Sequence, residues 1–404
     1  MCVCLLMRSH DTSTFSLLMA MGLSSYLGSV RQALSTQAAT TRNVHVVIGN
    51  EACDLDSAVS AVVAGYMLGS KTERLVVPML NIPRSDYPLK TEVQFVFNRL
   101  NITEDLLNFF DDLCLTGLHK AKKLEVTLVD HNVVPKCLEP INDAVVRVID
   151  HHKWEASFTS PIDKKIEMVG SCATLVGEKL LADHRELADE TITKLLLSTI
   201  IVDTVNFSKS ANKATPKDEK VFKELLSFAP NIDWDSEFVQ IKEAKSSVSW
   251  MAVRDLLRKD LKVISENELT ITVSTVPVSL KSLLAMSNFR ADLEVFRQQQ
   301  KANAVIVMTT TTKMQDSEQD CMQREMLIHA KIDPLREALV DYLKRFDQPL
   351  LDLEEITSCS TIYSQHPASS VFIQKNVGAS RKVVLPAVRL FAASYKISSE
   401  QDSA

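Results

Sequence analysis

The sequence predicts an α/β protein with a mostly parallel, doubly wound sheet, followed by a second, smaller α/β domain with a mixed sheet. Three observations support this prediction. Short apolar runs typical of buried strands alternate with helical stretches in the first half of the chain, as in parallel α/β folds. Three chain segments place an Asp at or just beyond the end of such a run. The length of 404 residues suits two domains.

The stretch from Val44 to Ser57 organises the first domain. Residues 44–48 are an apolar run typical of a strand buried on both faces, and Gly49-Asn50 is a turn dipeptide. Asp54 and Asp56 follow, and residues 57–68 are predicted to form a helix. Two close carboxylates are costly to desolvate together, and a hard divalent cation would offset this cost. The alternative is a solvated turn whose acids cap the helix.

Further elements follow along the first half of the chain. Two more predicted strands end in acids, at Asp130 and Asp150. Parallel strands bring their carboxyl ends to one edge of a sheet, so we expect these acids to meet Asp54 and Asp56. The predicted helices cover residues 21–36, 91–100, 103–120, 171–181 and 192–202, and the other strands cover 75–80, 124–130 and 144–150.

Two of these helices have ends of chemical interest. Ser171 is a candidate N-cap, and the free N–H groups behind it could instead meet an anion. Asp203 follows a strongly apolar helix. The helix dipole disfavours an acid at a C-terminus, so we expect a counter-charge beside Asp203. Residues 215–218 have the pattern of a capping box with Pro at the first helical position.

The turn-rich residues 223–245 are predicted to link the two domains. We expect an N-terminal extension over residues 1–20, a first domain over 21–222, a second over 246–396 and a tail over 397–404. The second domain should hold a helix ending near Leu257, strands at 269–276, 303–309 and 326–330, helices at 279–298 and 335–345, and a last helix that follows Pro386 and ends near residue 395. Residues 309–325 are polar and are predicted to form a hairpin loop.

Composition limits the function classes. The net charge of −6 and the lack of a long basic run argue against a broad nucleic-acid surface. No apolar run approaches the roughly 20 residues of a membrane span. Eight scattered Cys without paired spacing indicate reduced thiols and a cytoplasmic or nuclear protein. Residues 1–42 hold one acid and weakly resemble a mitochondrial transit peptide; the favoured alternative is an extended start, with Met21 as the native initiator.

The acids and two histidines form a candidate metal site. Carboxylates with one or two imidazoles suit Mn²⁺ or Mg²⁺, and four carboxylates can hold two ions. Two such ions would clamp a phosphoryl transfer and acidify a bridging water to hydroxide, the nucleophile. Cations from the second half of the chain would face a polyanionic substrate. The alternative is that these basic residues form only a solvated turn. The site comprises Asp54, Asp56, Asp130, Asp150, His151, His152 and Asp203, with Asn50 nearby, and the cations are Lys262, Arg381 and Lys382.

These motifs, in order and spacing, resemble the four motifs of the Asp-His-His (DHH) phosphoesterase superfamily. Residues 49–57 are similar to the prune branch of its exopolyphosphatases, and Ser380-Arg381-Lys382 resembles the phosphate-binding motif of the DHHA2 domain. The resemblance covers roughly residues 22–396. It implies a two-domain enzyme with the active site in the cleft between the domains.

The resemblance also implies roles for single residues. One metal would be held by Asp54, Asp130 and Asp203, with Asn50 beside them, and the other by Asp56, Asp130, His151 and Asp203. Asp150 would orient the histidines, while His152, Lys262, Arg381 and Lys382 would face the substrate phosphates. Related pyrophosphatases carry a His where Asn50 stands, which puts pyrophosphate turnover in doubt.

The expected activity is that of a metal-dependent phosphoanhydride hydrolase, an exopolyphosphatase that releases phosphate from short-chain polyphosphate. Two alternatives are a cyclic-nucleotide (cAMP) phosphodiesterase and a non-enzymatic scaffold for protein partners. No convincing base pocket supports the phosphodiesterase, and the intact acids argue against the scaffold. The expected partners are short polyphosphate or pyrophosphate-like anions, with protein partners as a further option and without nucleic acid or membrane.

Overall fold

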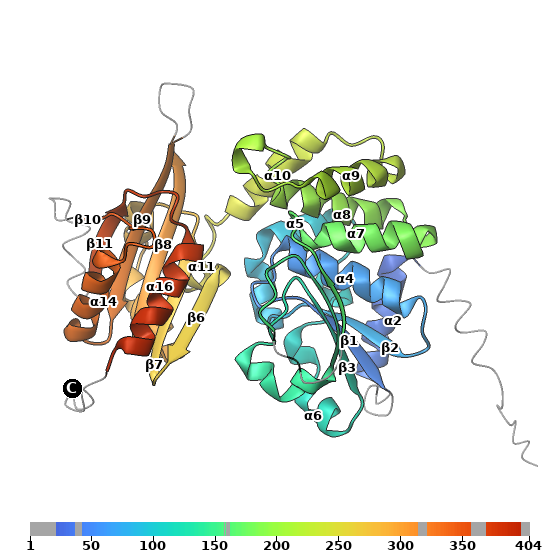
Figure 1. Cartoon of the computed structure of the whole chain (residues 1–404), viewed down its shortest axis with the longest axis horizontal. Helices are drawn as coiled ribbons and strands as arrows, with labels where there is room; N and C mark the ends of the chain where they lie inside the picture. Colours follow the sequence, from blue (N-terminus) through green and yellow to red (C-terminus); the bar gives the residue numbers. More distant parts are fainter. Residues whose placement is uncertain are drawn as a thin grey trace, which may run out of the picture. The chain divides into compact units, whose positions relative to one another are not determined.

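The computed structural model of the chain describes residues 22–36, 43–156, 158, 162–313, 321–356 and 369–396. The predicted N-terminal extension and C-terminal tail lie outside these ranges. The chain divides after Ser246 into two compact units (Figure 1). In the described part of the chain, no helix has the length and apolar character needed to cross a lipid bilayer.

Unit 1 contains a five-stranded sheet in which every pairing is parallel, in the order β2-β1-β3-β4-β5. This confirms the predicted parallel α/β fold. The prediction had missed β5, a short strand of mostly exposed polar residues. The strands are β1 Val44–Ile48, β2 Leu75–Met79, β3 Leu124–Val129, β4 Val145–Asp150 and β5 Asp163–Ile166.

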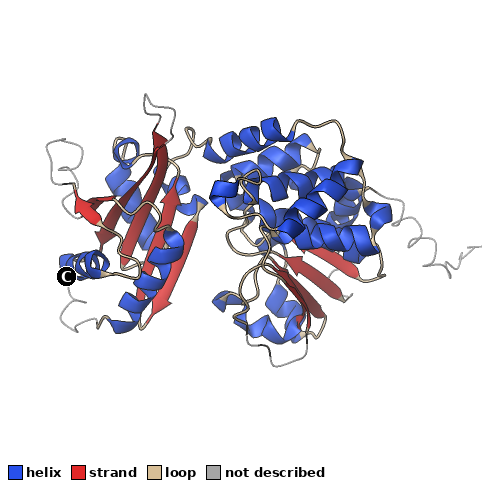
Figure 2. Cartoon of the chain, turned by 45° about the horizontal axis from the view of Figure 1, so that its top comes forward, coloured by secondary structure: helices blue, strands red, loops and turns tan. Residues whose placement is uncertain are grey.

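Helices cover both faces of this sheet, which is why β1 is buried along its whole length. Helices α4 and α7 pack on the sheet and on α8, while α6 lies across the sheet from α4 (Figures 1 and 2). The α-helices of unit 1 are α2 Leu23–Ser35, α4 Leu55–Gly69, α5 Thr91–Arg99, α6 Leu115–Lys120, α7 Cys172–Asp183, α8 Glu190–Asp203, α9 Pro216–Leu225 and α10 Trp234–Ser246.

Three details of unit 1 bear on the predictions. The helical region predicted at 103–120 consists of two short 3₁₀ turns, Glu104–Leu106 and Phe110–Asp112, followed by α6. The capping box at the start of α9 is present, with Thr215 and Asp218 bonded reciprocally. The stretch 223–245, predicted as a linker, contains most of α10, and the division between the units comes directly after that helix.

The strand order of the sheet indicates where a ligand site is expected. The order changes direction between β1 and β3, because β1 is followed along the chain by β2 on one side and by β3 on the other. In open parallel sheets, a crevice forms outside the carboxyl ends of the strands at such a point. The turns after β1 and β3 carry Asn50 and Asp130 respectively.

Unit 2 contains a six-stranded sheet in the order β10-β11-β9-β8-β7-β6, in which only β7 and β8 run parallel. This confirms the predicted mixed sheet. The strands are β6 Leu261–Glu266, β7 Leu269–Val276, β8 Ala304–Lys313, β9 Cys321–Ala330, β10 Leu353–Glu355 and β11 Ser369–Gln374. The α-helices are α11 Val253–Lys259, α12 Leu280–Leu284, α13 Phe289–Gln299, α14 Asp333–Arg345 and α16 Arg381–Ser394.

Two predictions for unit 2 were wrong in detail. The helix predicted at 279–298 is interrupted between α12 and α13, where Asn288 takes a left-handed conformation. Much of the polar stretch 309–325 is paired strand rather than loop, because β8 and β9 form a long antiparallel pair there. Repeated Thr residues in β8 satisfy strand propensity without apolar alternation, so the predicted strand 303–309 did not extend to Lys313.

Candidate metal centre

The acids predicted to meet do lie around the β1/β3 edge of unit 1. The Asn50 side-chain amide donates to Asp130 Oδ2 at 2.7 Å and to the Asp130 carbonyl at 3.3 Å. Asp130 follows β3 directly and has a φ of 61°, a left-handed conformation that Asp tolerates better than most residues. This backbone turn and the amide bond together fix the carboxylate of Asp130 at the strand ends.

Gly49 permits the tight turn that brings Asn50 to this position. A Cβ at Gly49 would collide with the Ser57 side chain and lie 2.8 Å from the Ser57 carbonyl. The Ser57 hydroxyl accepts a hydrogen bond from the Asn50 backbone at 2.7 Å. Asn81, after β2, donates to the Gly49 carbonyl at 2.9 Å. Asn81 was not predicted, although a polar residue directly after a buried strand is a usable signal.

Asp54 and Asp56 take different roles at the start of α4. Asp54 caps the helix by accepting from Ser57 N–H at 3.1 Å, as the capping interpretation predicted. Asp56 is buried, and its two oxygens accept from the backbone N–H groups of Cys172 at 2.6 Å and Ala173 at 2.8 Å. The anion at the N-terminus of α7 is therefore the carboxylate of Asp56. Ser171 stands at the N-cap position but makes no side-chain capping bond.

His151 presents one imidazole nitrogen to the carboxylates. Its Nδ1 lies 2.9 Å from the Val169 carbonyl, which orients Nδ1–H outward from the acids. Its Nε2 lies 3.2 Å from Asp130 Oδ1 and 3.8 Å from Asp56 Oδ2. Burial opposes a charge on this ring, but the hydrogen bond with Asp130 and the negative charges of Asp56 and Asp130 outweigh it and raise the His151 pKa to about 10.

Both carboxylate oxygens of Asp150 form hydrogen bonds. Its Oδ1 accepts from the backbone N–H of His151 at 2.7 Å and lies 2.8 Å from His152 Nδ1, while Oδ2 accepts from Asn132 at 2.6 Å. The His152 side chain is about half exposed, at 52%. Asp130, Asp150, His151 and His152 can each place one donor atom within 4.8 Å of the others. Asn132 was not predicted; its only sequence signal is its position two residues after Asp130.

Asp203 ends α8 with a carboxylate of which one oxygen is left without a hydrogen bond in the described part of the chain, although the expected counter-charge is supplied nearby by Lys245. Its Oδ2 is buried and has no hydrogen-bond partner within the described residues. Burial and then the negative charges of Asp56 and Asp54 raise the Asp203 pKa well above its usual range. The turn that follows includes Val205 at a φ of 52°, a conformation that is strained for a β-branched side chain. A strained turn beside a buried carboxylate oxygen without a hydrogen bond indicates that function, rather than stability, sets this position.

The donor set fits a divalent cation. Burial and then like charge raise the pKa of Asp56 and Asp130 also, with the Asp54 carboxylate contributing to both. The cluster therefore brings several carboxylates together in a buried site, where a bound cation would favour their ionised forms. Oxygen donors with one imidazole suit Mn²⁺ or Mg²⁺, and the unpartnered Asp203 oxygen is the atom that such an ion would satisfy.

The three predicted cations all belong to unit 2. Lys262 lies in β6, and Ser380 caps α16 by accepting from Lys382 N–H. The Arg381 guanidinium donates to the Asp260 carbonyl and to Asp260 Oδ1, both at 2.7 Å. Arg381 therefore has a partner within its own unit, a contact that the sequence did not indicate.

Comparisons with family models and with known relatives identify the family of this chain. A model of the DHH family, N-terminal domain, matches residues 45–202, and a DHHA2 domain model matches residues 239–391. Human Exopolyphosphatase PRUNE1 is 34% identical over 373 residues, which are 92% of this chain and 79% of the human protein. This chain belongs to the prune-type exopolyphosphatase family of DHH proteins.

Other comparisons extend the relationship beyond the prune branch. A manganese-dependent inorganic pyrophosphatase of Methanocaldococcus jannaschii is 27% identical over 241 residues, covering 57% of this chain and 71% of that protein. A crystal structure from Methanococcus jannaschii, assigned to the family II inorganic pyrophosphatases, superposes with a TM-score of 0.58. The match is 22% identical and covers 86% of this chain and 99% of the other, so it shows a shared fold.

Proposed function

We propose that this prune-family protein is a metal-dependent phosphoanhydride hydrolase, specifically an exopolyphosphatase that releases phosphate from short-chain polyphosphate. The observation that carries the proposal is the cluster of buried acids around His151, together with the Asp203 oxygen that has no hydrogen-bond partner among the described residues. Human PRUNE1, 34% identical, bears the name exopolyphosphatase, and this supports the choice of substrate.

Asp54, Asp56, Asp130, His151 and Asp203 would hold the metal, with two ions per site and Asn50 beside them. Bound divalent ions supply positive charge for the phosphoryl oxygens and lower the pKa of a coordinated water. The chain's contribution is to orient the carboxylates. The N–H groups of Cys172 and Ala173 hold both oxygens of Asp56, and the Asn50 amide holds Asp130.

Asp150 acts as a positioning residue, because its oxygens bind His152, Asn132 and the backbone of His151. Such partners fix the ring orientation of metal-site histidines. His152 has its Nδ1 on Asp150 and a half-exposed side chain, so its Nε2 is the atom suited to meet a substrate phosphate. Lys262, Arg381 and Lys382 are proposed to bind the anionic substrate, because cations are needed to balance polyphosphate charge.

The direct test is phosphate release by the purified full chain from tripolyphosphate, pyrophosphate and cAMP. Each substrate is offered with Mn²⁺, with Mg²⁺ and with excess EDTA. We expect metal-dependent release from tripolyphosphate that exceeds release from pyrophosphate, and no hydrolysis of cAMP. Turnover of cAMP alone would replace the proposal with a phosphodiesterase, and no turnover of any substrate with either metal would refute an enzymatic function.

A further inference from the structure

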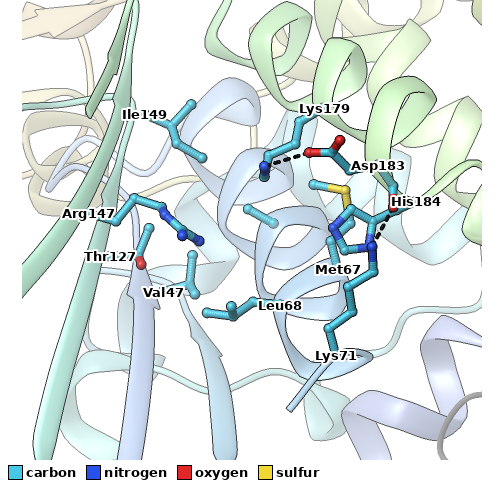
Figure 3. A pocket seen from close by; sticks show the side chains of 11 residues that line it. Val47, Met67, Leu68, Lys71, Thr127, Arg147, Ile149, Lys179, Asp183 and His184 are labelled. Carbon is cyan, nitrogen blue, oxygen red and sulfur yellow. Dashed lines mark hydrogen bonds and ion pairs between the residues drawn. The ribbon is translucent and has the colours of Figure 1, made fainter. Parts of the chain in front are cut away.

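Unit 1 contains a cavity of about 330 Å³ between the sheet and the C-terminal ends of α4 and α7 (Figure 3). Its size falls at the lower end of the range typical of small-molecule sites. The strands contribute Val47, Thr127, Arg147 and Ile149. Helices α4 and α7, with one residue just beyond the end of each, contribute Ala64, Met67, Leu68, Lys71, Lys179, Asp183 and His184.

This cavity is separate from the metal centre. Asp56 stands in the first turn of α4, whereas Met67 and Leu68 stand near the end of that helix. The eleven residues from Asp56 to Met67 span about 16 Å along a helix at 1.5 Å per residue. Helix α7 repeats this arrangement, with Cys172 at the metal end and Asp183 at the cavity end.

The sheet contributes polar side chains to the cavity wall. Thr127 and Arg147 are register partners on adjacent strands β3 and β4. The Nε of Arg147 donates to Asp163 at 2.7 Å. That bond uses one of the five N–H donors that a guanidinium carries. Figure 3 shows the end of the Arg147 side chain directed into the cavity, toward the side lined by Lys179 and His184.

The opposite wall adds two ammonium groups. Lys179 pairs with the Asp183 carboxylate at 2.8 Å, and Lys71 donates to the Asp183 carbonyl (Figure 3). Among the described lining residues, three are cations and one, Asp183, is an acid. Each ammonium carries three donors, and these bonds use one on each, so the wall can also bind an anion.

His184 provides an independent observation that points to a ligand. The residue is only 5% exposed, and its Nδ1 is buried with no hydrogen-bond partner within the described chain. A buried polar atom without a partner is uncommon and costs about 1–3 kcal/mol. Burial and then the nearby charge of Lys71 lower the His184 pKa, so the ring is neutral and does not itself supply a counter-charge.

The remaining walls are apolar. Val47 and Met67 are almost completely buried, and Ala64, Leu68 and Ile149 line the cavity beside them. A fully hydrated inorganic anion would gain nothing from these walls. A ligand with an apolar body and one acidic head would bury the body there and place the head on the cations.

We propose that this cavity, lined by Arg147, Lys179 and His184 over an apolar floor, binds a small amphipathic anion: a carboxylate or phosphate head on an apolar body. The head meets the guanidinium of Arg147 and the ammonium of Lys179, and a polar atom of the ligand satisfies His184 Nδ1. The site is independent of the proposed hydrolase activity, since no residue of the metal centre lines it.

Isothermal titration of the full chain with Mn²⁺ present tests the proposal with three probes: 2-naphthoate, 1-naphthylphosphonate and the neutral 2-naphthalenemethanol. We expect at least one anionic probe to bind, about tenfold or more tighter than the neutral probe, because hydrogen bonds to charged groups add to apolar burial. The carboxylate and phosphonate arms distinguish the two kinds of head group.

Variants locate the binding. Arg147→Gln and Lys179→Gln should each weaken the affinity for the anionic probe about tenfold, while the matched control Lys220→Gln, at an exposed side chain of α9, should leave this affinity unchanged. Asp203→Ala, which alters the metal centre, should also leave it unchanged. The proposal is overturned if neither anion binds more tightly than the neutral probe, or if binding survives both cavity variants. Loss in Asp203→Ala with retention in Arg147→Gln would also overturn it, by moving the binding to the metal centre. Circular dichroism melting verifies that each variant is folded.

Discussion

Asn50 and Asp130 join the ends of strands β1 and β3 through the 2.7 Å bond from the Asn50 amide to Asp130 Oδ2. These residues are 80 positions apart in the chain, and they meet where the strand order of the sheet changes direction. Asn50 therefore stands within reach of any ion held by Asp130. An amide donor at this position orients the carboxylate, whereas an imidazole could ligate the ion.

We predict that Asn50→His tightens Mn²⁺ binding, because imidazole suits the softer ion better than an amide oxygen. Isothermal titration with Mn²⁺ and Mg²⁺ measures the change, which should be larger for Mn²⁺. Asn50→Asp provides the comparison, since it adds charge without an imidazole. Unchanged or weaker Mn²⁺ affinity in Asn50→His would contradict the placement of Asn50 beside the metal.

Asp203→Ala should abolish hydrolysis of tripolyphosphate, because it removes a ligand proposed to serve both ions. The same substitution should not destabilise the metal-free protein, since it deletes a buried oxygen that has no hydrogen-bond partner among the described residues. Steady-state kinetics and urea unfolding in EDTA measure the two effects.

Two matched substitutions sharpen this prediction. Asp56→Ala should lower the metal-free unfolding free energy by about 1–3 kcal/mol, because the N–H groups of Cys172 and Ala173 lose their acceptor. Asp143→Asn, at an exposed acid of unit 1, should change neither property. Activity of Asp203→Ala within tenfold of wild type would refute its role as a ligand.

The pH dependence of stability should reverse when metal is added. The pKa of His151 is raised to about 10, and burial raises the pKa values of Asp56, Asp130 and Asp203. The metal-free fold therefore holds protons that the unfolded chain releases. Its unfolding free energy should fall as pH rises, between pH 6.5 and about 10 for His151 and from about pH 4 upward for the acids.

Metal binding requires the deprotonated forms, so Mn²⁺ affinity should rise over the same pH range and binding should release protons. Thermal unfolding at pH 6 and pH 9, with EDTA or with Mn²⁺, tests the sign. Titration in two buffers of different ionisation enthalpy counts the protons released. A metal-free protein whose stability rises over this range, or Mn²⁺ binding without proton release, would contradict the proposed ligand set.

Arg381→Ala should lower turnover of tripolyphosphate roughly a hundredfold, as for the loss of one preorganised donor to a developing charge. Arg381→Lys should also lower it, because an ammonium cannot copy the planar fork of a guanidinium. Mn²⁺ affinity should stay nearly unchanged, since the proposed ligands all belong to unit 1.

Asp260→Asn is the matched control for Arg381, because it weakens the ion pair that Arg381 makes in unit 2 while keeping the guanidinium. If Arg381 serves only that pair, Arg381→Ala and Asp260→Asn should have similar small effects on stability and none on rate. Wild-type kinetics in Arg381→Ala would show that the resemblance at Ser380-Arg381-Lys382 carries no catalytic role.

Local sequence patterns predicted part of the candidate site, but not its long-range contacts. The apolar run 44–48 predicted a buried strand, and its parallel partners predicted that Asp54, Asp130 and Asp150 would share one edge. The interactions of Asp56 were not predictable in the same way, because its partners Cys172 and Ala173 lie 116 and 117 residues further along. Ser171 was the local choice for the cap of α7, and a tertiary contact took that role.

The sequence by itself determined the alternation of strands and helices, the acids at the ends of the strands and the separate motifs in the two halves of the chain. These features depend on side-chain periodicity and turn residues, which act over a few positions. Only the tertiary structure decided that Asp203 Oδ2 lacks a hydrogen-bond partner among the described residues, that Arg381 binds Asp260 and that Arg147 and His184 line one cavity. Each of these depends on packing between distant segments, and burial, which raises the pKa of Asp203 and lowers that of His184, exists only once those segments have come together.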